Sequence, residues 1–191
     1  CAADGTVTPA PGQTVTCSIT NDDIAPTLTL VKTVINNNGG SLAVSDFPLF
    51  INGTPAISGT AYSQTANVQL TASETTQAGY APSAWGGDCA ADGTITLLPG
   101  DTKTCTITND DVAPTLTLVK TVVNDDGGDL TQADFPSFID GSPVAWDTPT
   151  AVTANEVHTA SETEQNGYLA STWGSDCAAD GTITLLPGDA K

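Results

Sequence analysis

Positive charge is scarce in this sequence. Its 191 residues include 4 basic side chains, all of them lysine, against 22 acidic ones, so the formal net charge is -18 at pH 7. A surface of this kind repels phosphate backbones and anionic membranes. Nucleic acid is therefore not expected as a partner.

Long apolar runs are also missing. No stretch approaches the roughly 18 apolar residues of a membrane-spanning helix, so membrane insertion is not expected. Aromatic residues make up 5% of the chain, while hydrophobic residues reach 39% and threonine is abundant. This composition suits thin domains built from strands. No secretion signal is visible, and the chain, which opens at Cys1, is interpreted as a segment of something longer. A lipid-bearing Cys1 of a mature lipoprotein is the alternative, but the repeat explains Cys1 better.

The chain consists of a tandem repeat. The string CAADGT begins at Cys1, Cys89 and Cys177, each 88 residues after the last. TLTLVKTV occupies residues 27–34 and again residues 115–122, at the same spacing. An 88-residue unit is thus present about twice, followed by the opening of a third copy.

Polar breaks mark the expected domain boundaries. Asn-Asp-Asp runs precede an Ala-Pro pair at the start of each TLTLVKTV segment. We therefore predict that residues 1–23 are the last hairpin of a preceding repeat, that residues 26–111 form a complete repeat, and that residues 114–191 form a second repeat without its last strand. Linkers of two or three residues imply a stiff string of domains.

Short turn sequences divide each unit. Gly-Gly pairs lie at residues 39–40 and 127–128, and Asn52-Gly53 and Asp140-Gly141 are hairpin signals because both residue types tolerate positive φ. Pro99-Gly100 predicts a further turn. If this turn closes a hairpin, the strand that follows it lies opposite the strand that precedes it. No 11-residue window shows a helical stripe. The pattern predicts an all-β chain of small Ig-like, Greek-key-type sandwiches.

Cysteines recur in phase with the repeat. Cys1 and Cys17 are 16 residues apart, as are Cys89 and Cys105, and the partner of Cys177 would fall beyond the end of the chain. One pair per repeat in an acidic, secreted-type protein predicts a disulfide. Metal binding is the alternative, but no CxxC motif or histidine cluster accompanies the cysteines. A hairpin at Pro99-Gly100 would put Cys105 opposite about Thr94, so Cys89 would have to fold back through a bulge.

Two of the four lysines lie inside the apolar TLTLVKTV segments. Because side chains alternate across a strand, Lys32 shares a face with Leu28 and Leu30 and points into the presumed core; Lys120 is its counterpart. An unpaired buried ammonium is costly. A compensating partner is therefore expected.

Two further polar residues show the same inward phase. Glu74 lies on the same face as Leu70 in the strand that ends in TASET, and Asn109 lies on the same face as Ile107 in TKTCTITN. Lys32, Glu74 and Asn109 thus come from three separate strands, all on core-facing sides.

These motifs together resemble the SpaA-like, or CnaB-type, prealbumin-fold domains of bacterial surface proteins and pilins. The matching segments are LTLVKTV, the stretches SETTQAGY and SETEQNGY, and TCTITND, in that order. The resemblance covers both units and implies tandem prealbumin-like β-sandwich repeats. It further implies an intramolecular isopeptide bond between Lys32 and Asn109, assisted by Glu74. In the second unit it implies Lys120 and Glu162, with the asparagine expected beyond the end of the chain.

Other interpretations of the polar residues stay open. Lys32 and Glu74 could form an ordinary buried ion pair. His158, the only histidine, has no metal-ligand partner at useful spacing and is interpreted as a surface or satisfied residue. Aspartates in turns could bind calcium through oxygen ligands, although solvated turns are favoured. These aspartates are Asp110, Asp111, Asp125, Asp126 and Asp129.

One tryptophan and one tyrosine of each unit could form a sugar-binding platform, although a place in the core is favoured. They are Tyr80, Trp85, Tyr168 and Trp173. No Ser/His/Asp order, phosphate loop or metal motif is present, so neither enzyme activity nor a cofactor or metal is expected.

The sequence therefore predicts a structural segment of an extracellular, cell-surface fibre, stalk or pilus-like filament. Its partners would be neighbouring repeats or copies of itself, head to tail. Either the polypeptide continues, or the N-terminal hairpin of one chain completes the last domain of the next by strand addition. The alternative function is an adhesin-type module that binds a host protein or glycan.

Overall fold

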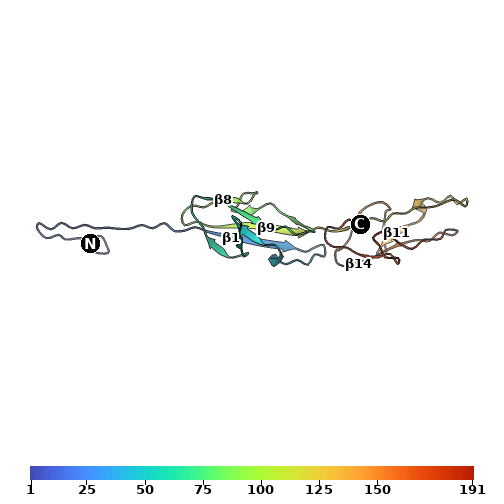
Figure 1. Cartoon of the computed structure of the whole chain (residues 1–191), viewed down its shortest axis with the longest axis horizontal. Helices are drawn as coiled ribbons and strands as arrows, with labels where there is room; N and C mark the ends of the chain where they lie inside the picture. The colour runs from blue at the N-terminus through green and yellow to red at the C-terminus, as the bar shows by residue number, and fades with distance from the viewer.

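Two β-rich bodies follow one another along the long axis of the molecule, after an extended N-terminal segment (Figure 1). The structure is a computed structural model that describes all 191 residues. Residues 1–25 are exposed throughout and carry no strand. The Cys1–Cys17 disulfide closes their far end into a loop. The helical segments are too short to span a lipid bilayer.

The first repeat is a sandwich of two sheets, which confirms the predicted all-β fold. One sheet has the order β4-β1-β9-β6, with β7 paired to β9, and the other has the order β3-β2-β5-β8. The strands of the first sheet are β4 (Ala61–Ser63), β1 (Thr27–Ile35), β9 (Thr102–Asp111), β6 (Tyr80–Pro82) and β7 (Gly86–Gly87). Those of the second are β3 (Thr54–Ala56), β2 (Leu49–Ile51), β5 (Gln69–Glu74) and β8 (Thr94–Thr96). A 3-10 turn, η1 (Val44–Asp46), precedes β2.

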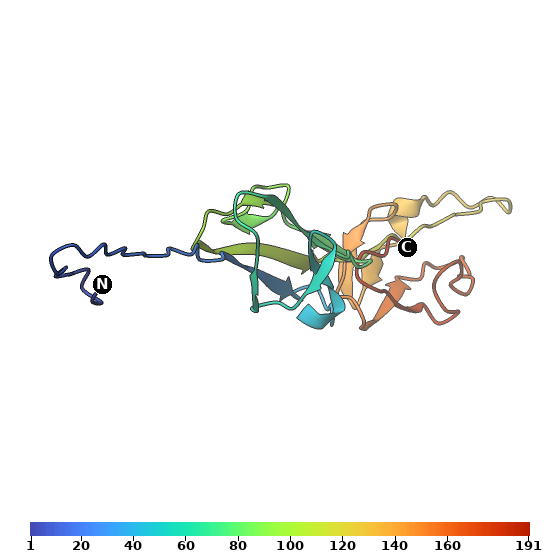
Figure 2. The same cartoon turned by 60° about the vertical axis from the view of Figure 1, so that its left-hand side comes forward.

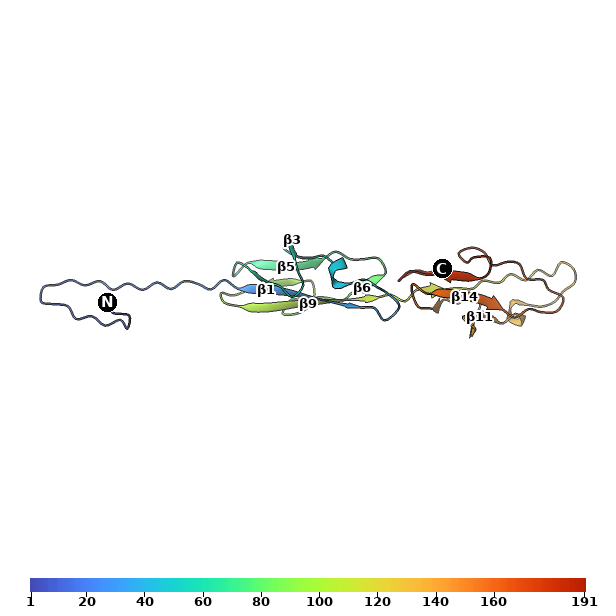
Figure 3. The ribbon, with the colours of Figure 1, turned by 90° about the horizontal axis from the view of Figure 1, so that it is seen from below.

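The first and last strands of the repeat are neighbours. β1 and β9 run parallel over nine residue pairs, in a register that places Lys32 beside Ile107 and Val34 beside Asn109. Both strands lie along the long axis of the molecule (Figure 3). Because they are parallel, β1 enters at one end of the domain and β9 leaves at the other.

The core lies between the two sheets and follows the predicted alternation. Leu28 and Leu30 of β1 are fully buried, and Ile107 of β9 is 4% exposed. Opposite them, β2 and β5 contribute the buried side chains Leu49, Ile51, Leu70 and Ala72. Of the alternate residues of β1, Thr27, Thr29 and Val31 are partly covered, and Thr33 and Ile35 are exposed.

The hairpin expected at Pro99-Gly100 is wrong. A turn does form there, with Asp101 N donating to Leu98 O. However, β8 before it pairs with β5, whereas β9 after it pairs with β1. The turn therefore carries the chain from one sheet to the other. Cys105 consequently does not lie opposite Thr94.

The second repeat reproduces part of this layout, without strands corresponding to β6, β7 and β9. Its sheet β12-β11-β14-β15 matches β3-β2-β5-β8, and β10 pairs with β13 as β1 pairs with β4. The elements are β10 (Thr115–Leu116), η2 (Gln132–Asp134), β11 (Ser137–Ile139), β12 (Ser142–Val144), β13 (Thr150–Ala151), β14 (Val157–Glu162) and β15 (Thr182–Thr184). Thr115 forms a parallel bridge with Ala190, so the C-terminus lies beside the start of this repeat (Figure 2).

The linker between the repeats, Val112 and Ala113, is held by backbone hydrogen bonds on both sides. Val112 N donates to Gly79 O of the first repeat at 2.9 Å, and Gly188 N of the second repeat donates to Val112 O at 2.8 Å. The same contact recurs before the first repeat, where Gly100 N donates to Ile24 O at 2.6 Å. The connection is thus a fixed part of both repeats.

A second contact joins a loop of the first repeat to a turn of the second. Ala154 N donates to Asn38 O, and Asn155 Nδ2 donates to Gly39 O, each at 2.8 Å. The buried Asp111 carboxylate fixes the loop from inside by accepting hydrogen bonds from Asn38 N and Gly40 N. We call the linker, together with the hydrogen bonds from Ala154 and Asn155 to the loop at Asn38 and Gly39, the joint.

Candidate functional site

Three polar side chains from separate strands are buried in the core of the first repeat. Lys32 is in β1, Glu74 ends β5 and Asn109 is near the end of β9. The side chain of Lys32 is 0% exposed and that of Glu74 is 5% exposed, and Asn109 is 0% exposed. The structure therefore brings the three predicted residues into the same apolar layer.

The lysine contacts the glutamate directly. Lys32 Nζ donates a hydrogen bond to Glu74 Oε2 and lies 4.5 Å from the centre of the Phe47 ring. Burial lowers the pKa of the Lys32 amine below its ordinary value of 10.5, while the hydrogen bond and charge of Glu74 act in the opposite direction. Burial thus favours the neutral amine, which is the nucleophilic form.

The side chain of Asn109 has no hydrogen-bond partner. Neither its Nδ2 nor its Oδ1 is paired, and Glu74 Oε1 is also buried without a partner. Leaving such a group unpaired costs about 1–3 kcal/mol, and native proteins rarely do so without a reason. Asn109 is two register positions from the neighbour of Lys32 on the adjacent strand. By strand geometry their Cα atoms are about 8 Å apart, within reach of an extended lysine side chain.

The second repeat contains the same ion pair. Lys120 Nζ lies 2.7 Å from the Glu162 carboxylate and 4.3 Å from the centre of the Phe135 ring. The two side chains are 16% and 12% exposed. β14 keeps the alternating burial of β5, so Glu162 faces inward as its counterpart does.

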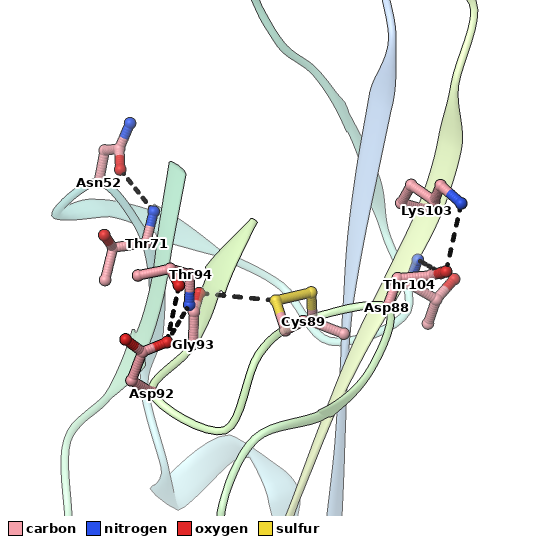
Figure 4. The surroundings of a disulfide bond; sticks show 10 residues. Asn52, Thr71, Asp88, Cys89, Asp92, Gly93, Thr94, Lys103 and Thr104 are labelled. Carbon is pink, nitrogen blue, oxygen red and sulfur yellow. Dashed lines mark hydrogen bonds and ion pairs between the residues drawn. A yellow bond between two sulfur atoms is a disulfide. The ribbon is translucent and has the colours of Figure 1, made fainter. Parts of the chain in front are cut away.

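The predicted disulfide of the complete repeat is present. It joins Cys89, in the loop between β7 and β8, to Cys105 of β9 (Figure 4). A tight turn in which Gly93 N donates to Ala90 O folds Cys89 back toward β9. Next to it, the Asp88 carboxylate accepts a hydrogen bond from Thr104 N at 2.8 Å. The disulfide therefore ties this loop to the last strand.

Cys177 of the second repeat is a free thiol. Burial, with a smaller contribution from Asp176, raises its pKa above the ordinary value of 9.0. It is therefore protonated and weakly reactive at neutral pH.

Loss of the Cys89–Cys105 bond is expected to lower the free energy of unfolding of the first repeat by about 3 kcal/mol, because the bond restricts the unfolded chain. A Cys89→Ser/Cys105→Ser double variant, unfolded in denaturant, measures this change. In the native, unreduced protein a thiol reagent should label Cys177 alone. Labelling of either Cys89 or Cys105 would count against the bond.

The aromatic candidates of the first repeat, Tyr80 and Trp85, have structural roles. Tyr80 is buried and packs edge-on against Phe47, and its hydroxyl accepts a hydrogen bond from Leu42 N. Trp85 packs against the core. No three His, Cys, Asp or Glu side chains gather where they could hold a metal ion. The aromatic residues therefore present no exposed platform in the first repeat.

His158, interpreted from the sequence as a surface or satisfied residue, is buried with partners for both ring nitrogens, which the sequence had not identified. It is 5% exposed, and its Nδ1 lies 2.6 Å from Asp140 Oδ2. The equivalent residues of the first repeat are Leu70 and Asn52. The paired replacement of both positions was the signal that could have revealed this contact.

Comparison with known families identifies each repeat. The model of the family described as the prealbumin-like fold domain, of the SpaA type, matches residues 23–107 and again residues 111–190. No curated protein and no solved structure matches the chain. SpaA-like prealbumin domains are structural modules that occur in bacterial surface proteins. The chain belongs to this family of prealbumin-like fold domains, and it carries two of them in tandem.

Proposed function

We propose that the chain is a tension-resisting segment of an extracellular, pilus-like filament or stalk, in which a Lys–Asn isopeptide bond crosslinks each complete repeat. The observation that carries the proposal is the buried Asn109 amide without a hydrogen-bond partner, on the strand beside Lys32. An ordinary Lys32–Glu74 ion pair would leave that amide unexplained.

The chemistry needs only the three side chains. The neutral Lys32 amine attacks Cγ of Asn109, a C–N bond forms, and the Asn109 amide nitrogen leaves as ammonia. Glu74, hydrogen-bonded to Lys32 Nζ, polarises the amide carbonyl when protonated and transfers the proton from the amine to the leaving group. The product removes the buried charge and the unpaired amide nitrogen together.

The strand arrangement gives this bond a mechanical role. Tension along the filament enters at the start of β1 and leaves at the end of β9, so it shears two parallel strands that share nine residue pairs. A covalent bond from Lys32 to Asn109 would pass the force directly between the two strands. The 76 residues between Lys32 and Asn109 would then carry no load. Because the bond keeps these residues out of the force path, the repeat could not lengthen by about 250 Å, which is the extended length of that segment.

Single-molecule pulling on the whole chain tests this function. In reducing buffer, the wild-type first repeat should show no extension step of that length, whereas an Asn109→Ala variant should. A full-length step in the wild type would contradict the proposal. The second repeat, with its Lys120–Glu162 pair, should extend in both proteins and serves as the internal reference.

Head-to-tail arrays of such repeats are part of the proposal. The contact between Gly188 N and Val112 O in the joint has its equivalent between Gly100 N and Ile24 O at the start of the first repeat. Repeats joined by the same contact would keep a constant orientation to one another. This supports a filament of fixed geometry.

A further inference from the structure

His158 is held between two hydrogen-bond acceptors. Its Nδ1 lies 2.6 Å from Asp140 Oδ2 and its Nε2 lies 2.7 Å from the backbone oxygen of Thr153. Asp140 also accepts a hydrogen bond from Thr159 N, through its other oxygen. Both ring nitrogens can donate at once only when the ring carries two protons. The geometry therefore fits the imidazolium ion.

The acceptor of one of these bonds belongs to the joint. The oxygen of Thr153 and the nitrogen of Ala154 are part of the same planar peptide group. The oxygen accepts from His158 Nε2 at 2.7 Å, and the nitrogen donates to Asn38 O of the first repeat at 2.8 Å. One rigid peptide thus links the histidine to the neighbouring repeat, and each bond polarises the other.

We propose that His158 is a pH-sensitive latch of the joint: its protonated ring fixes the Thr153–Ala154 peptide in the orientation that docks on Asn38, and loss of a proton loosens the contact. If the remaining proton stays on Nδ1, toward the Asp140 carboxylate, the lone pair of Nε2 faces the lone pairs of Thr153 O. The peptide must then turn away, and the donor to Asn38 turns with it.

The charged surroundings set the direction of the response. Burial by itself would lower the pKa of His158, but its hydrogen bonds to Asp140 and to Thr153 O, with the charge of Glu156, raise it above 6.5. β15 places Ile183 beside His158, and the loop of residues 36–40 carries no titratable side chain. The pKa of His158 is higher in the folded state than in the unfolded state. Its contribution to stability is therefore complete below the ordinary histidine pKa, and it is lost as the pH rises through the raised pKa of the folded state.

The first repeat lacks this device. Leu70 and Asn52 take the places of His158 and Asp140. The turn nevertheless keeps its backbone contact in both repeats. Asn67 N donates to Leu97 O in the first repeat, and Asn155 N donates to Leu185 O in the second. The turn therefore folds without the histidine. A pH response is expected only where His158 meets the joint, and it does not depend on the isopeptide bond.

NMR on the whole chain tests the latch. The protection of the Ala154 amide against hydrogen exchange is measured at a pH below 6.5 and at a pH above the pKa measured for the His158 ring, and is corrected for the intrinsic pH dependence. It should fall about tenfold between the two, as expected for one lost hydrogen bond. Residual dipolar couplings should show a wider range of orientations between the two repeats over the same interval. Buried amides of β14 should keep their protection, because the sheet itself does not open.

The matched control is the Asp140→Asn/His158→Leu double variant, which installs the pair found in the first repeat. It should fold and show no pH dependence at Ala154. The proposal is overturned if wild-type Ala154 protection stays constant while the His158 ring titrates, or if the double variant keeps the response. The wild-type titration alone is decisive should the variant fail to fold.

Discussion

The intact chain is expected to have a mass lower than its sequence by one ammonia, and by four hydrogens for its two disulfides. After reduction the ammonia deficit should remain, because it reports the Lys32–Asn109 bond of the first repeat. Glu74→Gln, which has nearly the same shape but cannot take up the proton, should restore the full mass. Electrospray mass spectrometry with peptide mapping locates the crosslink.

The stability change should be large. By the chain-entropy relation used for disulfides, a crosslink between positions 32 and 109 is worth about 4–5 kcal/mol. Glu74→Gln should therefore lower the melting temperature of the first repeat well beyond an ordinary surface substitution. Glu162→Gln is the matched control, since it removes the equivalent glutamate of the second repeat and should leave the mass deficit unchanged. If the folded wild-type protein showed no mass deficit, Lys32 and Glu74 would form an ordinary buried ion pair and the isopeptide bond would be ruled out.

Gly39→Ala is expected to open the joint without unfolding either repeat. A Cβ at Gly39 would come within 2.3 Å of Ala154 O and 2.8 Å of Ala154 N. Backbone cannot shift as a side-chain tip can, so the loop and the turn must separate. The hydrogen bonds of Ala154 and Asn155 to the loop would then be lost, at about 1 kcal/mol each.

Gly127→Ala provides an almost ideal comparison. Gly127 occupies the same loop position in the second repeat and has a φ of 87°, against 90° for Gly39, but a Cβ there meets nothing within 4 Å. The strain of a positive φ is thus common to both variants, and the difference between them isolates the joint. Small-angle scattering and residual dipolar couplings should show bending in Gly39→Ala alone. Equal effects of the two variants would mean that the loop contact does not hold the joint.

Several parts of the site could be predicted because strand alternation is a local rule. The spacing of Leu28, Leu30 and Lys32 fixes which side of a strand the lysine occupies, whatever that strand packs against. The same holds for Glu74 and for Asn109, and all three are buried in the structure. The 88-residue period likewise predicted the disulfide partners, which the structure joins.

The pairing of strands could not be predicted by local rules. Pro99-Gly100 is equally compatible with a hairpin and with a crossover between sheets, and only the packing of β8 on β5 and of β9 on β1 distinguishes them. For the same reason, turn and strand signals could not predict that β1 and β9 are parallel neighbours, which places Asn109 on the strand next to that of Lys32.

The all-β class, the repeat, the phase of the polar core residues and the cysteine pairs can be read from the sequence, since each follows from period and alternation. Which strands are neighbours and how the two repeats meet depend on the tertiary fold. The contacts of His158 show why: its ring reaches a turn five residues earlier, and the peptide of that turn reaches Asn38. Contacts between segments more than 100 residues apart depend on the packing of whole sheets, and no local pattern records that packing.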